Sequence, residues 1–563
     1  MDEPPAQRKH VLEHDDRYYS WERFSPEDAG LLAVRLTDVG TQTALTVTPD
    51  ENIRRAAHRA WAGARQSRAP GTTIQILAEM GLRGVDPDQK LEETFRNHGH
   101  ASVADMARFE VHFHNVPGHI PLLLFHLGRT NSGQEKSTRY QSAFGKATLH
   151  PLRHYIKDAP RRVVEELERE YQAIGTTMQE RFRGTFASIV ERFTERFAPA
   201  SKQEESALKS RALDTARSLL LFGTSTGCTY ETSAREWTSR IASLRAMPGP
   251  YHQRLADHLE YLLAPPAEIE EVMGFKAEAP SLIRHTAPDA TVGENLRRLE
   301  ERVRGSIPWR MPAPRTEQSQ GVAMLTQGID AAGLVIAQYL TAAIENVDLA
   351  DAAGYVLTRS SPELQQLSAI VFAGHTHQRE PPQIADTTGI GAVLTMSLGE
   401  ARDLNRHRAF ARYINGWSFL YGAPCAVERA KAIMDDGFVM PLYLDIPGFE
   451  AERQRMIDSL QEHYDLADRF IDKTRAELGD ADYGWFMNLL PMAHRVDLCL
   501  HGTPHQLHYM THLRVREGGH INYRALAYDL NKRVADANPA LEGIRLRTTR
   551  PDPANREEFF SRK

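Results

Sequence analysis

The sequence predicts a helix-rich α+β fold in which two similar halves follow one another along the chain. Two long charged segments, 161–197 and 449–477, have amphipathic spacing and predict long helices. Residues 109–114 alternate apolar and polar side chains, which is the pattern of a half-buried strand. A short Gly-His segment, 99–105 or 374–380, opens the same order of patterns in each half and indicates two pseudo-repeats of one plan.

The composition excludes several classes of protein. Hydrophobic residues make up 41% and charged residues 25% of the 563-residue chain, as in a globular protein of more than one domain. The net charge of −6 comes without a domain-wide basic stripe, so no nucleic-acid partner is expected. Three scattered cysteines, Cys228, Cys425 and Cys499, favour a reducing compartment. The first residues lack the apolar core of a signal peptide and no apolar run reaches about 18 residues, so we expect a cytoplasmic protein without a membrane partner.

Changes of pattern divide the chain into parts. Residues 264–320 are dense in proline and predict a connector, after which a helical pattern runs from Val322 to Ala353. The polar residues after Arg545 predict a frayed tail. The expected parts are an N-terminal arm (1–50), a first repeat (51–263), a connector with a helix (264–345), a second repeat (346–545) and a polar tail (546–563).

The polar residues of the two Gly-His segments have matching spacing. In each segment the histidine precedes a carboxylate by five residues, and an arginine segment follows about thirty residues later. Between these motifs in the first half, the apolar run 120–127 fits either a buried helix or a buried strand. The matched positions are His100 with His375, Asp105 with Glu380, and Leu127-Gly128-Arg129 with Arg406-His407-Arg408.

A polar turn at 128–140 predicts an anion-binding loop. Arginine presents a planar fork of donors that suits phosphate or a planar carbonyl system. Glu135 can accept a hydrogen bond from a ring N–H, and Tyr140 can stack or donate. The alternative is a solvated loop. The candidate residues are Arg129, Ser132, Gly133, Glu135, Ser137, Arg139 and Tyr140.

Residues 397–413 predict an arginine-rich helix. In a helix the two pairs of arginines spaced by four residues would each share a face. His407 lies between two arginines, so we expect its imidazole to stay neutral. The alternative is an exposed basic helix. The two pairs are Arg402 with Arg406 and Arg408 with Arg412.

Four histidines between 501 and 512 are spaced four, three and four residues apart, which invites a metal site on one helical face. No Asp, Glu or Cys completes the set at ligand spacing, and Gly502 and Pro504 disturb the first turn. We therefore expect no metal.

Together these motifs resemble the flavin-dependent thymidylate synthases, the ThyX family. The family pattern is a Gly-His-x-(Ser/Thr)-x-x-Glu segment, an Arg-His-Arg helix, and then Ser-x-Arg-Tyr. GHASVAD matches the opening through His100 and Ser102, with Asp105 in place of glutamate. STRY at 137–140 matches the last element closely.

The two halves depart from the family pattern in complementary ways. The first half keeps only Arg129 of its Arg-His-Arg, whereas the second half keeps 406–408 complete. In turn, the second half has Gly416-Trp417-Ser418-Phe419 in place of Ser-x-Arg-Tyr. The closing segment LRVREGGHINYRALA resembles the family's last motif, with Asn522 for glutamine and Arg524 for glutamate.

The resemblance implies a role for each matched residue. An arginine near the pyrimidine carbonyl would stabilise the anion that forms as C5 becomes nucleophilic. By this resemblance the catalytic residues are Arg516 and Arg245, the nucleotide contacts are Arg129, Glu135, Ser137, Arg139, Tyr140 and Arg217, and the flavin contacts are His100, Ser102, Asp105, Arg235, His375, Glu380, Arg406, His407 and Arg408.

The resemblance also implies the reaction and the assembly. The reaction is the C5 methylation of a uracil nucleotide, dUMP to dTMP, with methylenetetrahydrofolate as carbon donor and FAD, reduced by NADPH, as hydride donor. The family is a homotetramer with shared sites, so a tandem chain is expected to form a homodimer that acts as a pseudo-tetramer. Two alternatives stay open: a diverged flavoenzyme with another nucleotide or methyl donor, and a non-catalytic nucleotide-binding or scaffold protein.

Overall fold

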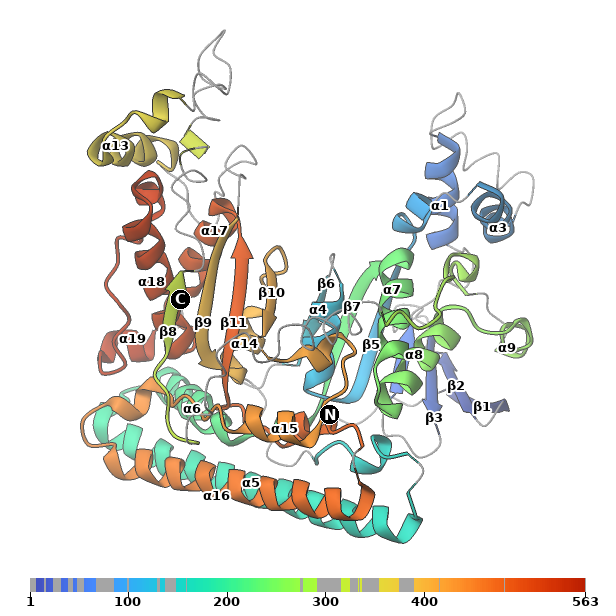
Figure 1. The fold of residues 1–563 in the computed structure, drawn as a ribbon, viewed down its shortest axis with the longest axis horizontal. Helices are drawn as coiled ribbons and strands as arrows, with labels where there is room; N and C mark the ends of the chain where they lie inside the picture. The colour runs from blue at the N-terminus through green and yellow to red at the C-terminus, as the bar shows by residue number, and fades with distance from the viewer. Residues whose placement is uncertain are drawn as a thin grey trace.

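Two long helices, α5 (Arg161–Phe197) and α16 (Glu450–Leu478), lie side by side and form a base under two sheets (Figure 1). They run antiparallel, because Lys473 near the end of α16 pairs with Glu166 and Glu170 near the start of α5. Their apolar faces pack inward, as amphipathic spacing predicts. Both predicted long helices are therefore confirmed.

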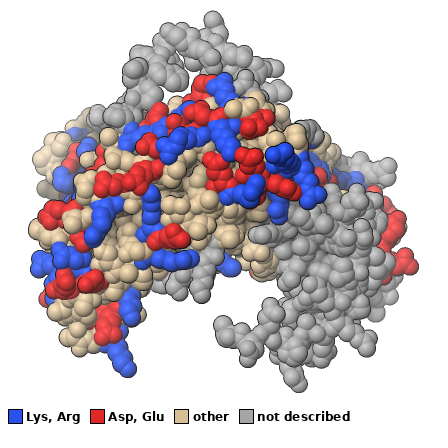
Figure 2. All heavy atoms as spheres, turned by 90° about the horizontal axis from the view of Figure 1, so that it is seen from below, with Lys and Arg blue, Asp and Glu red and all other residues tan. Residues whose placement is uncertain are grey.

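The outer face of this base carries both signs of charge (Figure 2). Lys and Arg side chains are interspersed with Asp and Glu side chains over the face that is visible from below. Arg181 on α5 bonds Glu462 on α16 at 2.5 Å, and Lys473 bonds Glu170 at 2.7 Å. Exposed pairs of this kind fix the register of two helices more than they add stability.

The computed structural model describes part of the chain. The described residues are 7–14, 17–23, 32–38, 44–47, 55–66, 86–98, 101–128, 132–136, 148–157, 159–273, 277–290, 315–324, 333, 335–336, 354–373, 389–414, 416–479 and 481–561.

Two antiparallel sheets are present among the described residues. The first has the order β1-β2-β3-β4-β5-β7-β6 and the second the order β10-β11-β9-β8. The predicted strand at 109–114 is confirmed within β5. The strands are β1 (Gln7–His14), β2 (Arg17–Arg23), β3 (Leu32–Asp38), β4 (Ala44–Val47), β5 (Arg108–Pro117), β6 (Ser132–Glu135), β7 (Ser225–Ser233), β8 (Gly321–Met324), β9 (Ile390–Ser397), β10 (Ala411–Ile414) and β11 (Arg495–Gly502).

Helices cover the sheets and join them to the base, which makes the fold a helix-rich α+β fold as predicted. None of the described helices is long and apolar enough to cross a membrane. Besides α5 and α16, the helices are α1 (Arg55–Gln66), α3 (Pro87–His98), α4 (His119–Leu127), α6 (Lys202–Ala216), α7 (Ala234–Ala246), α8 (Pro250–Leu263), α9 (Ala267–Met273), α13 (Ser361–Val371), α14 (Leu398–Leu404), α15 (Val427–Met434), α17 (Pro504–Arg514), α18 (Ile521–Ala537) and α19 (Arg556–Phe560).

The two halves bond to each other reciprocally through the segments before β7 and β11. The amide of Phe222 donates to the carbonyl of Leu490, and the amide of Met492 donates to the carbonyl of Leu220, both at 2.8 Å. Each half also repeats the order strand, helix, edge strand, long helix, central strand, helix, helix; α6 is added after the long helix of the first half and α15 before that of the second. This reciprocity is what two pseudo-repeats require, although their origin by duplication stays a prediction.

The apolar run 120–127, which fitted a helix or a strand, forms the buried helix α4. Its entry requires a glycine: a Cβ on Gly118 would lie 2.6 Å from the carbonyl oxygen of Phe222. That carbonyl accepts the amide of Gly118 at 2.9 Å, and in the second half Met492 accepts the amide of Gly399 at the same distance. A glycine near the start of the helix thus bonds a neighbouring carbonyl after both β5 and β9, but only at Gly118 would a Cβ clash with it.

The N-terminal residues, which were predicted as an arm, dock on the main body as strands. Residues 7–47 contribute four strands, and β4 pairs with β5 in the core of the first half. Four-strand pairing is a tertiary arrangement, and short strands of mixed polarity give little local signal.

The predicted helix from Val322 to Ala353 is wrong at its start. Residues 321–324 form β8, which pairs with β9 at the edge of the second sheet. Most of the remaining segment up to Ala353 lies outside the described residues. Pairing with a neighbouring strand has overridden the local helical pattern.

The predicted frayed tail is also wrong. Helix α19 packs on α6, and the ring of Phe559 stacks on Phe197 with 3.9 Å between centroids. Phe559 is 2% exposed. The guanidinium of Arg211 donates to the carbonyls of Phe559 and Ser561 at 3.2 and 2.9 Å. The aromatic pair at the end of the chain closes the core at this point.

Candidate functional site

Helix α14 and the turn after it contact strand β6 across the junction of the two halves. The side chain of Arg402 binds the carboxylate of Glu135 and donates to the carbonyl of Lys136 at 3.0 Å. Nη2 of Arg408 donates to the carbonyl of Gly133 at 2.5 Å. Residues 132–135, which were predicted as part of the loop 128–140, form strand β6, and the Ser137–Tyr140 motif follows it in sequence. Arg408 of the Arg-His-Arg segment of the second half therefore contacts the strand that precedes the predicted nucleotide motif of the first half.

Glu135 is buried at this contact. Burial raises the pKa of its carboxyl, and the guanidinium of Arg402 opposes this shift. Its carboxylate is thus engaged by an arginine of the other half, rather than lying open for a ring N–H as predicted. The pair fastens β6 to α14.

The predicted helix 397–413 is wrong in its second part. Helix α14 ends at Leu404, residues 405–410 form turns, and β10 begins at Ala411. The Arg408–Arg412 pair therefore does not share a helical face. Instead, both guanidinium groups lie over the ring of Phe125, at 5.9 and 5.7 Å from its centroid.

His407 is buried and its pKa is lowered well below the usual value, first by burial and then by Arg514 and Arg412. Nε of Arg514 donates to Nε2 of His407 at 2.5 Å. The predicted neutral imidazole agrees with this direction. The arginines that act on it come from elsewhere in the fold rather than from positions 406 and 408.

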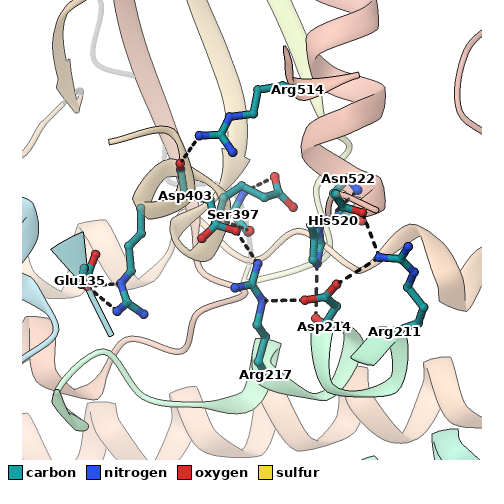
Figure 3. A network of polar contacts seen from close by, with 12 residues as sticks. Glu135, Arg211, Asp214, Arg217, Ser397, Asp403, Arg514, His520 and Asn522 are labelled. Carbon is teal, nitrogen blue, oxygen red and sulfur yellow. Dashed lines mark hydrogen bonds and ion pairs between the residues drawn. The ribbon is translucent and has the colours of Figure 1, made fainter. Parts of the chain in front are cut away.

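A chain of charged side chains, some buried and some partly exposed, continues from Arg514 (Figure 3). Arg514 donates to the backbone carbonyl of Asp403 at 3.2 Å, and Nη2 of Arg217 donates to the Asp403 carboxylate at 2.7 Å. Arg217 also lies 3.9 Å from the carboxylate of Asp214. Alternating cations and anions compensate one another where water is excluded.

Arg211 and His520 complete this chain on the side of the base. Arg211 lies 3.9 Å from the Asp214 carboxylate and donates to the carbonyls of Gly518 and Gly519 at 3.2 Å. Nε2 of His520 lies 3.3 Å from the carbonyl oxygen of Asp214. Helix α6 of the first half thereby positions the turn between α17 and α18 of the second half.

A small polar cavity of about 10 Å³ lies beside this chain, large enough for about one water molecule. Arg217, Glu400, His520 and Asn522 are among the residues that line it. Glu400 accepts hydrogen bonds from Nε2 of Gln320 at 2.7 Å and from the amide of Ser397 at 3.2 Å. Burial raises the pKa of Glu400 to about 7. A carboxyl at this position can hold a proton near neutral pH.

Several buried polar atoms near Phe125 have no hydrogen-bond partner in the part of the chain that the structure describes. They are both ring nitrogens of His126, both side-chain polar atoms of Asn405, and Nε of Arg408. Burial, and then Arg412, lowers the pKa of His126 to about 3. Unpaired buried polar atoms are costly, so these atoms are candidates for contacts with a polar ligand.

The two predicted catalytic arginines lie apart from this site. Arg516 is exposed in the turn after α17, whereas Arg514 faces His407. Arg245 at the end of α7 bonds the carboxylates of Asp257 and Glu260 and the carbonyl of Thr286. Its guanidinium is committed to carboxylates of α8.

Of the other predicted residues, the structure joins one pair. Arg235 bonds Asp105 at 3.0 Å, with both side chains about half exposed. Ser102 lies in a short 3-10 helix, Ala101–Asp105. Several predicted residues lie outside the described part of the chain, namely His100, Arg129, Ser137, Arg139, Tyr140, His375 and Glu380.

Sequence analysis missed Asp214, Glu400, Asp403 and Arg514. Only the acidic residues of GEARDL carried a local signal, since carboxylates among arginines indicate ion pairing. The contacts of Arg514 join residues more than a hundred positions apart, and the carbonyl of Asp214 meets His520 of the other half. Among the described residues, no group of three His, Cys, Asp or Glu side chains is arranged to hold a metal ion.

The fold and the site thus define a helix-rich α+β protein with a charged site between its two halves. Some buried polar atoms at this site have no hydrogen-bond partner among the described residues. Residues 44–257 match the family model described as thymidylate synthase complementing protein. The predicted ThyX-family resemblance is therefore confirmed for this part of the chain. The match includes β4, so the family region begins before residue 51.

Relatives and solved structures give weaker likenesses. A UPF0159 protein of Chlamydia pneumoniae is 23% identical over 350 residues, which cover 61% of this chain and 58% of the relative. The UMP/dUMP methylase PolB of Streptomyces cacaoi, solved with 5-Br UMP, is 14% identical, with 41% of this chain and 96% of PolB covered and a TM-score of 0.28. ThyX of Helicobacter pylori, solved with FAD and dUMP, is 15% identical, with 42% and 97% covered and a TM-score of 0.22.

Proposed function

We propose that this protein is a flavin-dependent enzyme that methylates a uracil nucleotide, dUMP, at C5, with methylenetetrahydrofolate and NADPH as co-substrates. One observation carries the proposal: Arg402 and Arg408 of the second half hold the strand that leads into the nucleotide motif of the first half. The Arg-His-Arg end of one half thus contacts the strand that precedes the nucleotide motif of the other half in sequence. Family membership of residues 44–257 supports the same chemistry.

The nucleotide would be held by the loop after β6. Arg129, Ser137 and Arg139 would bind the phosphate, and Tyr140 would stack on or donate to the base. Arg217, predicted as a nucleotide contact, is bonded to Asp403, so we assign it the task of orienting that carboxylate. Arg408 and the unsaturated atoms of His126 and Asn405 would face the flavin ring and its carbonyls.

Arg514 is the described arginine placed to stabilise negative charge at this site. It lies against His407 and the carbonyl of Asp403, and a neutral His407 accepts one of its N–H groups. A preorganised guanidinium lowers the energy of an anionic pyrimidine because it needs no reorganisation during the reaction. FAD, when bound, would supply the hydride.

The assembly and the location stay proposals. We propose a homodimer that works as a pseudo-tetramer, acting in the cytoplasm on a small nucleotide. A second candidate is an enzyme of the same fold with another nucleotide or methyl donor. It is favoured by Asn522, which replaces the family's glutamine and bonds the amide of Leu442 and the carbonyl of Met440. That position has a structural task here.

The test is the visible absorption spectrum of the purified full chain, saturated with FAD, before and after addition of dUMP. Flavin bands that shift with dUMP, and a shift that is lost in Arg139→Ala, are expected. Oxidation of NADPH that requires both dUMP and methylenetetrahydrofolate separates the first candidate from the second. A protein that takes up no FAD would remove both candidates and leave a scaffold.

A further inference from the structure

The register of the sheets sets up an equivalence between positions in the two halves. Ser132 on β6 pairs with Glu231, two residues before the N-cap of α7. Ala411 on β10 pairs with His501, two residues before the N-cap of α17. Four residues before these strands, Gly128 corresponds to His407. Seven residues after the N-caps, Arg240 corresponds to Met510.

Arg240 fills the space that a side chain at 128 would need. A Cβ built on Gly128 would lie 1.8 Å from Nη2 of Arg240. Gly128 has φ −117°, a conformation open to any residue, so space rather than backbone strain requires glycine here. The guanidinium of Arg240 is 0% exposed and donates to the carbonyl of Leu124 at 3.2 Å.

The second half holds the opposite pair at the same positions. His407 has a buried imidazole, and Met510 is 1% exposed. The second half has an uncharged side chain at 510, whereas a guanidinium at 240 in the first half does not leave room even for a methyl group at 128. Glycine and arginine therefore form a matched replacement for histidine and methionine.

The second half also has apolar, packed side chains in place of the Ser-x-Arg-Tyr motif. At Gly416–Phe419, where the first half has Ser-Thr-Arg-Tyr, the rings of Trp417 and Phe419 lie 5.5 Å apart and are 1% and 5% exposed. Phe419 also packs on Phe486 at 5.7 Å. This segment overlaps the short 3-10 helix η8 (Ser418–Tyr421). Helix η8 contacts α4, the helix that precedes Gly128 in sequence. Apolar rings thus stand where the other site has its polar loop.

We infer that each chain carries one flavin–nucleotide site, and that the equivalent position around Gly128 is a closed structural region sealed by Arg240 and by Trp417 and Phe419. The inference rests on the proposed function for the identity of the ligand. The seal itself rests on the contacts of Gly128 and Arg240. Of the two equivalent positions in each chain, the one around Gly128 is thus part of the core between the two repeats.

The first test is the stoichiometry of FAD on the full chain. One FAD per chain at saturation, measured as flavin released on denaturation, is expected. Two FAD per chain would overturn the inference while leaving the proposed function intact. An absence of bound FAD would remove the proposed function. The closure of the region around Gly128 by Arg240 would then be tested by the stability experiment below.

The second test is a double-mutant cycle in thermal unfolding. Gly128→Ala should lower Tm, because its methyl group enters the space of Arg240. Arg240→Met introduces the residue found at 510. In the Arg240→Met background, Gly128→Ala should lower Tm by less than it does in the wild-type background. The matched control is Gly184→Ala, since no atom lies within 4 Å of a Cβ at 184. A Tm for Gly128→Ala no lower than that of wild type would overturn the seal.

Discussion

Burial moves the pKa values of two side chains near the candidate site in opposite directions. The imidazole of His407 is pushed towards its neutral form, and the carboxyl of Glu400 is pushed towards its protonated form with a pKa of about 7. Both shifts have the same cause, since a charged form loses solvation when it is buried. The site is thus surrounded by groups that are neutral or paired near neutral pH.

Glu400 should make stability depend on pH. Its folded-state pKa of about 7 lies above its ordinary value of 4.5, so its protonated form favours folding. That stabilisation is complete below pH 4.5 and is lost as the pH rises to 7. Glu400→Gln cannot ionise, so at pH 8 it should be more stable than wild type by up to about 3 kcal/mol, and at pH 4.5 this advantage should vanish. Thermal unfolding at both values measures this, and a difference independent of pH would contradict it.

Arg514, rather than Arg516, should matter for turnover. Arg514→Lys keeps a charge but loses the planar fork that reaches His407 and Asp403, so kcat should fall by about 10²-fold. Arg516→Lys is the matched control, because Arg516 is exposed in the turn after α17. Steady-state rates with dUMP decide between them, and an equal loss in both variants would remove the assignment.

At the scale of elements, the contact of β6 with α14 rests on the buried pair Glu135–Arg402. Arg402→Met would leave the carboxylate of Glu135 buried without its cation, at a cost of about 3–5 kcal/mol. Nucleotide affinity should fall as well, because β6 leads into the nucleotide loop. Denaturant unfolding and dUMP titration measure the two effects.

Two further variants test that argument. Glu135→Gln/Arg402→Met removes both charges and should recover part of the lost stability. Arg161→Ala breaks the exposed pair with Glu165 on α5 and should leave stability nearly unchanged. Equal stability losses in Arg402→Met and Arg161→Ala would mean that the junction does not depend on the buried pair.

Elements with strong periodicity could be predicted from the sequence, and elements made by pairing could not. Helices α5 and α16 follow from amphipathic spacing over many turns. The segment 397–413 has helical composition, yet β10 within it forms by pairing with β11. Strand β8 was missed for the same reason, because a four-residue edge strand depends on its neighbour β9.

At the scale of the whole molecule, the C-terminal residues belong to the core. Phe559→Ala would remove a ring that stacks on Phe197 and packs edge-on against Phe193, and should cost about 3–5 kcal/mol. Phe560→Ala is the control, because this neighbouring ring is only partly buried. Denaturant midpoints measure both, and equal losses would contradict the packing argument.

The sequence by itself determined the long helices, the strand at 109–114 and the family resemblance. These features depend on periodicity and motifs that are read within a few turns of the chain. Only the tertiary structure decided which motif copies meet. Arg402 reaches Glu135, Arg514 reaches His407, and Arg240 occupies the space beside Gly128. Such contacts join residues that are more than a hundred positions apart in sequence, and only the packed core brings these residues into contact.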